Sequence, residues 1–193
     1  IAFQDRATRI IDQTQRRSFE VIVSAFIMTF HDEAEHNVDT TGTVEPYNRH
    51  YYVKLRSSLK KLSGRRNGDR QLIMFLTGAG GSGKTEIINS VLAYTKGFCM
   101  QMKYVFDKRL IVITAMSGVA ATLINGKMIH SAAKLNCEKI TVEHQKEWAN
   151  TRMLIINEIS FASSTDLLKL NESLHKLKQV HDKYGGLHEA ERN

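Results

Sequence analysis

The spacing of hydrophobic positions changes along this chain, and each spacing predicts a different element. Within residues 15–30 the apolar side chains recur every three or four positions, which places them on one face of a helix that faces a core. The members of this face are Phe19, Ile22, Val23, Phe26, Ile27 and Phe30. The polar stretch that follows, residues 31–49, contains Gly42 and Pro46 and predicts a loop or an insertion.

Three later runs are short and almost continuously apolar, at residues 72–76, 110–114 and 153–156. Such runs suit strands that are buried on both faces of a parallel sheet. A helix is predicted over residues 166–180, with Ser163 as its N-cap and Asp166 completing a capping box. Its predicted buried side is Leu167, Leu170, Leu174 and Leu177. Strands that alternate with helices predict a doubly wound α/β fold with a mainly parallel sheet flanked by helices.

The first apolar run leads into the sequence GAGGSGKT, which fits the phosphate-binding pattern G-x-x-x-x-G-K-[ST] at every fixed position. Glycines let backbone N–H groups close around phosphate oxygens, and the positive end of the following helix attracts the same anion. We therefore expect Lys84 to reach the β- and γ-phosphates of ATP and Thr85 to bind Mg²⁺. The residues expected to bind ATP are Gly78, Ala79, Gly80, Gly81, Ser82, Gly83, Lys84 and Thr85.

A second motif ends the third apolar run, where Asn157 and Glu158 follow in sequence. P-loop ATPases place an Asp-Glu pair here, because the Asp supports Mg²⁺ and the Glu polarises the attacking water. Asn157 keeps the shape of an aspartate but lacks its charge, and Mg²⁺ prefers anionic oxygen. We expect weak metal support from Asn157, slow hydrolysis with ATP binding largely kept, and catalytic roles for Glu158, as the general base, and for Lys84.

The charge of the chain bears on its partners. The formal net charge of +7 suggests a polyanionic partner, although solubility alone would also explain it. Residues 49–70 are strongly basic and have Tyr47, Tyr51 and Tyr52 near their start. Such a segment either binds single strands by charge and stacking or forms a solvated helix face with a linker. The longest apolar stretch is too short to span a bilayer, so no membrane partner is expected.

The region between the two motifs reads ITAMSGVAA at residues 113–121 and NGKMIHS at residues 125–131. With NEISF at residues 157–161, these stretches resemble the T-A-x-T-G-x-A-A, G-x-T-I-H-S and D-E-I-S-M motifs of the petite-integration-frequency (Pif) family of superfamily-one DNA helicases, Helitron-transposon relatives included. Residues 11–19 resemble the family's L-N-x-E-Q-x-x-A-F segment, and residues 183–186 resemble its P-F-G-G turn. The departures from these motifs are Met116, Ser117, Met128 and Asn157.

The resemblance implies a RecA-like P-loop NTPase domain from a helicase that uses ATP and Mg²⁺. Such helicases move 5′ to 3′ along single-stranded DNA and serve repair, recombination and telomere maintenance. By this match Gln15 contacts adenine, and a second, C-terminal motor domain with an arginine finger belongs to the same parent chain beyond this sequence. The residues implied to contact DNA phosphates are Ser117, Gly118, Val119, His130 and Ser131.

On this interpretation residues 1–70 hold the N-terminal helix, the adenine-contacting segment, the polar insertion and a basic linker, and residues 71–193 form an incomplete ATPase domain. The expected location is intracellular, in the nucleus or mitochondrion if the source is eukaryotic. Two alternatives stay open. One is a degenerate, non-catalytic nucleotide- or DNA-binding fragment of transposon origin, and the other is a generic P-loop ATPase or kinase. Without the resemblance, His130 would suit a partly buried structural histidine.

Overall fold

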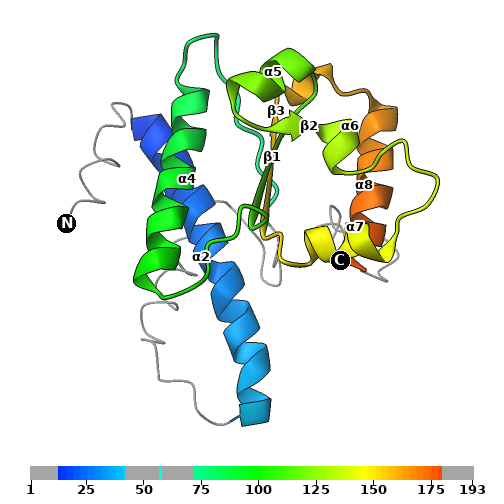
Figure 1. The fold of residues 1–193 in the computed structure, drawn as a ribbon. Helices are drawn as coiled ribbons and strands as arrows, with labels where there is room; N and C mark the ends of the chain where they lie inside the picture. The colour runs from blue at the N-terminus through cyan, green and yellow to red at the C-terminus, as the bar shows by residue number, and fades with distance from the viewer. Residues whose placement is uncertain (1–12, 42–56, 58–71, 180–193) are drawn as a thin grey trace. The chain divides into compact units, whose positions relative to one another are not determined.

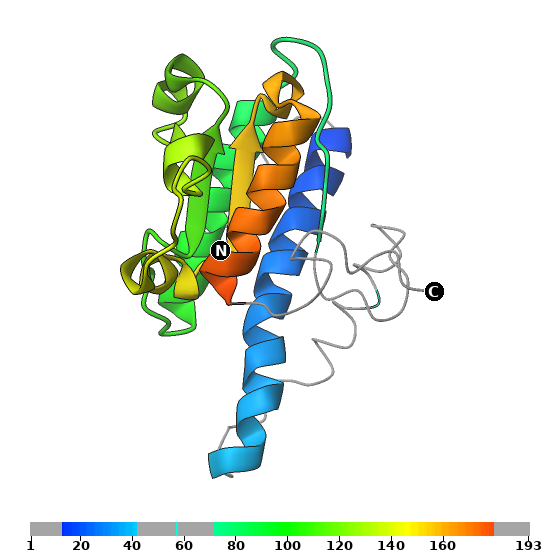
Figure 2. The same ribbon diagram turned by 90° about the vertical axis from the view of Figure 1, so that its right-hand side faces the viewer.

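The computed structural model describes residues 13–41, 57 and 72–179, and Figures 1 and 2 show the fold in two views. Contacts group the chain into two units, Ile1–Val105 and Phe106–Asn193, and each is described by itself. The predicted domain boundary after residue 70 and the basic segment at residues 49–70 lie outside the described residues, apart from Ser57. The predicted P-F-G-G-like turn at residues 183–186 also lies outside them. These assignments stay predictions.

The first unit contains a pair of helices, α2 (Gln13–Thr41) and α4 (Lys84–Gln101), which lie side by side in Figure 1. Aromatic contacts join them: the Phe19 ring meets the edge of Tyr94 at 5.7 Å between centroids, and Phe30 meets Phe98 at the same separation. Edge-to-face pairs of this kind add to the free energy of burying the rings. The predicted apolar face is confirmed, since its members are buried except for the half-buried Ile22.

Helix α2 continues beyond the segment that its apolar spacing predicted. The sequence predicted a loop over residues 31–49, but residues 31–41 are helical, so the first part of that prediction is wrong. No Gly or Pro occurs between Phe30 and Gly42, and a polar composition alone does not stop a helix. Residues 42–49 lie outside the described part of the chain.

The predicted strand at residues 72–76 is also wrong, because these residues carry no regular secondary structure. The side chains of Ile73 and Phe75 are 58% and 67% exposed, whereas the sequence predicted burial on both faces. A strand needs a neighbouring strand to satisfy its backbone N–H and C=O groups. In the described part of the chain, the pairings of the sheet involve only three strands from the second unit.

That sheet is built from β1 (Ile111–Ala115), β2 (Lys127–Met128) and β3 (Met153–Asn157). The strand order is β2-β1-β3 and both pairings are parallel, so the predicted parallel α/β architecture is confirmed. Two of the predicted apolar runs therefore form strands, each within one residue of its expected bounds. Ala115 is in register with both Met128 and Asn157, so the three strands end level with one another.

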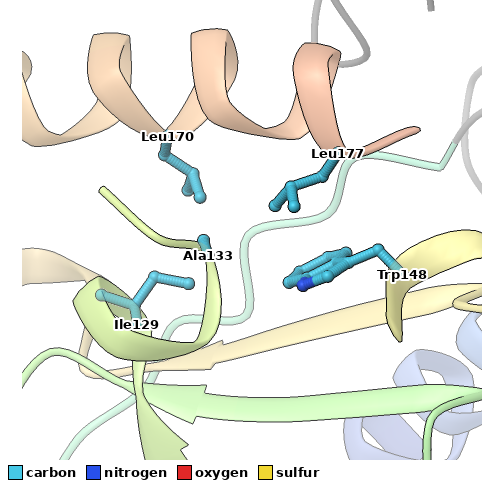
Figure 3. Packing of buried hydrophobic residues seen from close by; sticks show 5 residues of the cluster. All are labelled: Ile129, Ala133, Trp148, Leu170 and Leu177. Atoms are coloured by element: carbon cyan, nitrogen blue, oxygen red, sulfur yellow. The ribbon is translucent and has the colours of Figure 1, made fainter. Parts of the chain in front are cut away.

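One face of the sheet is covered by a helical layer that consists of α6 (Ile129–Ala132), α7 (Val142–Ala149) and α8 (Ser164–Lys178). Figure 3 shows Leu170 and Leu177 of α8 pointing toward the other members of this core. The buried members are Ile129, Ala133, Trp148, Leu170 and Leu177. Val112, Leu154 and Ile156 of the sheet pack against them, which agrees with the neighbouring positions of β3 and α8 in Figure 2.

Helix α8 was predicted over residues 166–180, and its capping box is confirmed. The Ser163 hydroxyl accepts from the Asp166 backbone N–H at 3.1 Å, and the Asp166 carboxylate accepts from the Ser163 N–H at 3.0 Å. Leu170 and Leu177 are buried and Leu174 is half-buried. Leu167 was predicted to be buried, but this prediction is wrong: the residue lies in the first turn of the helix and is 42% exposed.

The other face of the sheet carries the short helix α5 (Gly118–Leu123), which follows β1 directly. Its buried residues Ala120 and Ala121 form a small cluster with Ala115 and Ile124. Gly126 then lies so close to β1 that a Cβ at this position would be 2.7 Å from the carbonyl oxygen of Ile113. The helix begins at Gly118, and its small residues allow close helix–sheet packing. In the described residues, no helix is long and apolar enough to cross a membrane.

Candidate functional site

The phosphate loop, residues 78–85, joins an irregular segment to the first turn of α4. Gly81 and Gly83 have φ angles of 75° and 80°, in the left-handed region that residues with a Cβ rarely adopt. Glycine is therefore favoured at both positions by the backbone conformation. The nucleotide-binding pattern requires glycine at position 83 and permits it at position 81. The Ser82 N–H donates to the Ala79 carbonyl at 3.2 Å and closes a turn inside the loop.

The Lys84 side chain folds back over this loop. Its ammonium donates to the carbonyl oxygens of Gly78 at 2.7 Å and Ala79 at 2.9 Å, and it lies 3.2 Å from the Ser82 hydroxyl. A cation held at the mouth of the loop is well placed to exchange these neutral carbonyl partners for phosphate oxygens, with which hydrogen bonds are stronger.

The start of α4 offers donors as well. Gly83 is its N-cap and has no side chain to accept from the first-turn N–H groups, and the helix itself begins at Lys84. Uncapped N–H groups at the positive end of an 18-residue helix attract anions. Thr85 follows in the first turn, and its side chain is exposed, as a ligand of a nucleotide-bound metal must be.

Gln15, in the first turns of α2, contacts the same loop. Its side-chain Nε2 donates to the Ser82 carbonyl oxygen at 2.8 Å. A Cβ on Gly83 would lie 2.5 Å from this Nε2 atom, so the glycine also leaves room for the glutamine. The structure thus brings Gln15 to the phosphate loop, across 67 positions of sequence. An adenine contact, which the resemblance implies, stays a prediction.

In the second unit, the parallel strands end level and bring four residues of the sequence motifs to one edge of the sheet. Ser117 follows β1, His130 follows β2, Asn157 ends β3 and Glu158 comes next. We call these four residues the strand-end cluster. The Met116 N–H donates to the Asn157 carbonyl at 3.3 Å and extends the pairing of β1 with β3 to this edge.

Glu158 adopts φ 57° and ψ 40°, a left-handed conformation that is uncommon for a residue with a side chain. It forms the N-cap of the 3-10 helix η1 (Ile159–Phe161), and its side chain is exposed. Backbone strain of this kind costs about 1–3 kcal/mol and is concentrated at functional sites. In this turn the Glu158 side chain is accessible to solvent.

The side chains implied to contact DNA differ in how available they are. The Ser117 hydroxyl accepts from the Ala120 N–H at 3.2 Å and caps α5. Gly118, Val119 and Ser131 are exposed, with Val119 at 77%. His130 is half-buried: its Nε2 lies 3.7 Å from an Asp166 carboxylate oxygen, and its enclosed Nδ1 has no hydrogen-bond partner in the described part of the chain.

Asp166 is a neighbour of this cluster that the sequence motifs did not reveal. Its carboxylate accepts from the Ser163 hydroxyl and N–H, and these hydrogen bonds hold the pKa of Asp166 below its usual value. It therefore presents a negative charge to His130, which forms an ion pair with it when the imidazole is protonated. The capping box was visible in sequence, but its position beside His130 depends on how α8 packs against α6.

The donors available for Mg²⁺ are few. Across the described residues, no group of three or more His, Cys, Asp and Glu side chains could hold a metal ion. In the first unit Thr85 provides a hydroxyl. In the second unit Asn157 provides a neutral amide oxygen, where a carboxylate would be stronger. Mg²⁺ usually keeps waters and binds through phosphates as well as protein oxygens, so each residue by itself suits a metal that arrives with a nucleotide.

Comparisons with known proteins agree with the motifs. The profile of the PIF1-like helicase family matches residues 55–188, which is more than half of the chain. The ATP-dependent DNA helicase PIF1 of Saccharomyces cerevisiae is 23% identical over 203 aligned residues, covering 95% of this chain and 22% of the relative.

Two further relatives are the ATP-dependent DNA helicases RRM3 of Saccharomyces cerevisiae, 29% identical, and Pif1 of a Psychrobacter species, 30% identical. The alignment with each relative covers 59% of this chain. It covers 16% of RRM3 and 18% of the Psychrobacter Pif1, so this chain spans about a fifth of the length of the curated relatives that it matches. No solved structure gives a significant match. The resemblance predicted from the motifs is confirmed: this chain belongs to the PIF1-like helicase family.

Proposed function

We propose that this chain is the ATP-binding part of a DNA helicase motor, and that it binds ATP with Mg²⁺ through its phosphate loop. The observation that carries the proposal is the loop itself, in which the Lys84 ammonium bonds to the Gly78 and Ala79 carbonyls and two left-handed glycines precede the start of α4. Family membership and the names of the relatives, which are ATP-dependent DNA helicases, support the same nucleotide and the same class of activity.

In this proposal each residue has a stated task. Lys84 and the N–H groups of the loop bind the β- and γ-phosphates, Thr85 binds the accompanying Mg²⁺, and Gln15 contacts adenine. Glu158 is the general base that orients and deprotonates the attacking water, and its exposed side chain is accessible for that task. Bound Mg²⁺ would supply a positive charge that stabilises the phosphate oxygens.

Asn157 makes this chain a weak catalyst in the proposal. An amide oxygen donates less electron density to Mg²⁺ than a carboxylate does, so metal support falls while the phosphate contacts of the loop remain. The same residue favours the second candidate, a non-catalytic module that holds nucleotide or DNA without turnover. The two candidates differ in one measurable respect, which is whether restoring the carboxylate restores hydrolysis.

For the DNA partner, we propose single-stranded DNA contacted through the end of the sheet. The exposed Val119 and Ser131 and the net charge of +7 support a surface that accepts a phosphate backbone. Ser117, Gly118 and His130 are further proposed contacts, although Asp166 faces His130 and would repel a phosphate there. Movement from 5′ to 3′ and roles in repair, recombination and telomere maintenance are proposed for the parent protein, together with its second motor domain.

The test is ATP hydrolysis by the chain and by Asn157→Asp, each with and without single-stranded DNA. We expect Asn157→Asp to hydrolyse ATP about tenfold faster, in the range of changes to metal-supporting groups, and we expect DNA to stimulate it. The matched control is Asn150→Asp, which adds the same charge at the exposed C-cap of α7.

The outcomes separate the candidates. Equal rates for the chain and for Asn157→Asp, with nucleotide still bound, would support the non-catalytic module and refute our account of Asn157. Faster hydrolysis that single-stranded DNA leaves unchanged would point to an ATPase without a DNA role.

A further inference from the structure

We propose that Gln15 is a positioning residue for the phosphate loop, in addition to any contact with adenine. Its task is to hold the peptide between Ser82 and Gly83 so that the N–H of Gly83 faces the bound phosphates. The inference rests on the proposed function, because it assumes that the loop binds a triphosphate. It assigns to Gln15 an effect on phosphate affinity that does not depend on the base.

Two observations place Gln15 against the backbone of the loop. Its Nε2 donates to the Ser82 carbonyl oxygen at 2.8 Å, in a partly buried setting. The next residue has no space for a side chain, since a Cβ on Gly83 would be 2.5 Å from Nε2 and 3.3 Å from Cδ of the same glutamine. The contact is therefore made with the backbone at the glycine that directly precedes Lys84.

Because a peptide bond is rigid, the contact from Gln15 to the Ser82 carbonyl also fixes the direction of the Gly83 N–H. A trans peptide is planar, and its C=O and N–H groups point in opposite directions. When Gln15 fixes the Ser82 carbonyl toward α2, the Gly83 N–H must point away from α2. Gly83 is in the left-handed conformation, at 80° in φ, and backbone N–H groups in such turns form concave anion sites.

Gln15 and Lys84 brace the loop in different ways. The Lys84 ammonium bonds to the Gly78 and Ala79 carbonyls, and it must leave them when it moves to a phosphate. The bond from Gln15 to Ser82 does not involve the ammonium, so it persists in the bound state. We therefore expect Gln15 to matter most once Lys84 has changed partners.

Helix α2 is suited to act as a fixed support. Phe19 lies one turn after Gln15, and its ring meets Tyr94 of α4 edge-on at 5.7 Å. Helix α4 begins at the end of the loop. The contact between Phe19 and Tyr94 therefore holds α2, which carries Gln15, against the helix that follows the loop. The glutamine amide has a second N–H and an oxygen left for a base, so positioning and base contact are compatible.

The experiment measures binding of Mg²⁺-tripolyphosphate, which has phosphates but no base, beside binding of MgATP to the 193-residue chain. The test variant is Gln15→Leu, which is close in size but lacks the donor. The matched control is Gln13→Leu, on the exposed start of the same helix. We expect Gln15→Leu to weaken tripolyphosphate about fivefold, the worth of roughly one hydrogen bond, and to weaken ATP at least as much.

A loss of ATP affinity with unchanged tripolyphosphate affinity would overturn the inference, because Gln15 would then contact only the base. Unchanged affinity for both ligands would overturn it as well. If the unsubstituted chain binds neither ligand, the proposed function fails instead.

The inference can also be tested without a ligand. The backbone amide signal of Gly83 in an NMR spectrum should shift in Gln15→Leu and stay in place in Gln13→Leu, with both variants unfolding at the temperature of the parent chain. An unmoved Gly83 signal in a folded Gln15→Leu protein would show that the glutamine does not control that peptide.

Discussion

The phosphate loop and the strand-end cluster differ in the groups that they offer to a ligand. The loop offers mainly backbone N–H groups, whereas the cluster offers side chains. The loop takes its donors from the backbone of eight consecutive residues, and its two left-handed glycines are sequence neighbours of the lysine that serves it. The strand-end cluster takes its groups from side chains that are far apart in sequence, from Ser117 to Glu158. A parallel sheet with level strand ends is what places those side chains at one edge.

This difference explains why the two regions tolerate change differently. Backbone donors do not change with side-chain identity, so a loop that keeps its glycines and lysine keeps its function. A cluster of side chains loses a function when one member changes, and we propose that Asn157 is such a change. On the proposed function, the chain combines a complete phosphate motif with an altered metal-supporting motif, and each of the following substitutions tests one side of this contrast.

The largest effect is expected at the loop, for Lys84→Ala. Removing the ammonium should weaken ATP binding by about 100-fold or more, because hydrogen bonds to charged groups are the strong ones. The control is Lys96→Ala, on the exposed face of the same helix, and it should bind ATP as the parent chain does. Binding can be followed by calorimetry. An affinity for ATP that survives Lys84→Ala would count against the phosphate site.

A second substitution, Glu158→Gly, tests whether the left-handed backbone conformation of Glu158, in the strand-end cluster, is strained. Glycine adopts the left-handed conformation of this position without the steric cost, so we expect the free energy of unfolding to rise by about 1 kcal/mol. Hydrolysis by Asn157→Asp should be lost when this change is added. Glu158→Gln removes the same base but keeps the Cβ, so it should lose hydrolysis without any gain in stability. Equal stability of both variants would refute the strain argument.

The last expected effect concerns the cap beside the cluster, which changes stability alone, and it depends on pH. Ser163→Ala should lower the free energy of unfolding by about 1 kcal/mol at pH 7, the usual worth of an N-cap. The pKa of Asp166 is lowered mainly by the Ser163 hydroxyl and N–H, so its contribution is present above the unfolded pKa of about 3.9 and is lost as pH falls through the native pKa.

Urea unfolding between pH 7 and pH 2.5 checks this expectation. The difference between the parent chain and Ser163→Ala should shrink below about pH 4, since protonated Asp166 no longer holds the hydroxyl as a charged acceptor. Ser164→Ala, at the next and exposed position, should show no such pH dependence. A difference that stays constant down to pH 2.5 would mean that the cap does not depend on the charge of Asp166.

Much of the fold was predictable, and the failures share a cause. The runs that became β1 and β3 and the stripe on α2 follow from the spacing of apolar residues, which is local. The run at residues 72–76 is as apolar as the strands, but it carries no regular structure and exposes Ile73 and Phe75. Strand formation needs a partner, and composition does not say whether one is present.

The candidate site shows the same division. All eight residues of the phosphate loop, together with Asn157 and Glu158, could be chosen from spacing alone, since the pattern is short and each position has its own chemical reason. Two contacts could not be chosen in this way. They are the bond from Gln15 to the Ser82 carbonyl and the approach of Asp166 to His130, which join residues 67 and 36 positions apart.

The order of residues was thus enough to identify a phosphate-loop motif and a family and to predict a weakened metal position at Asn157, because each depends on neighbours along the chain. The packing of α2 against α4 and of α8 against α6 was needed to learn what supports the loop and what charge faces His130. The covalent chain fixes strongly how a few consecutive residues can lie relative to one another. Contacts between distant segments depend on the free energy of burying whole surfaces, which no short stretch of sequence records.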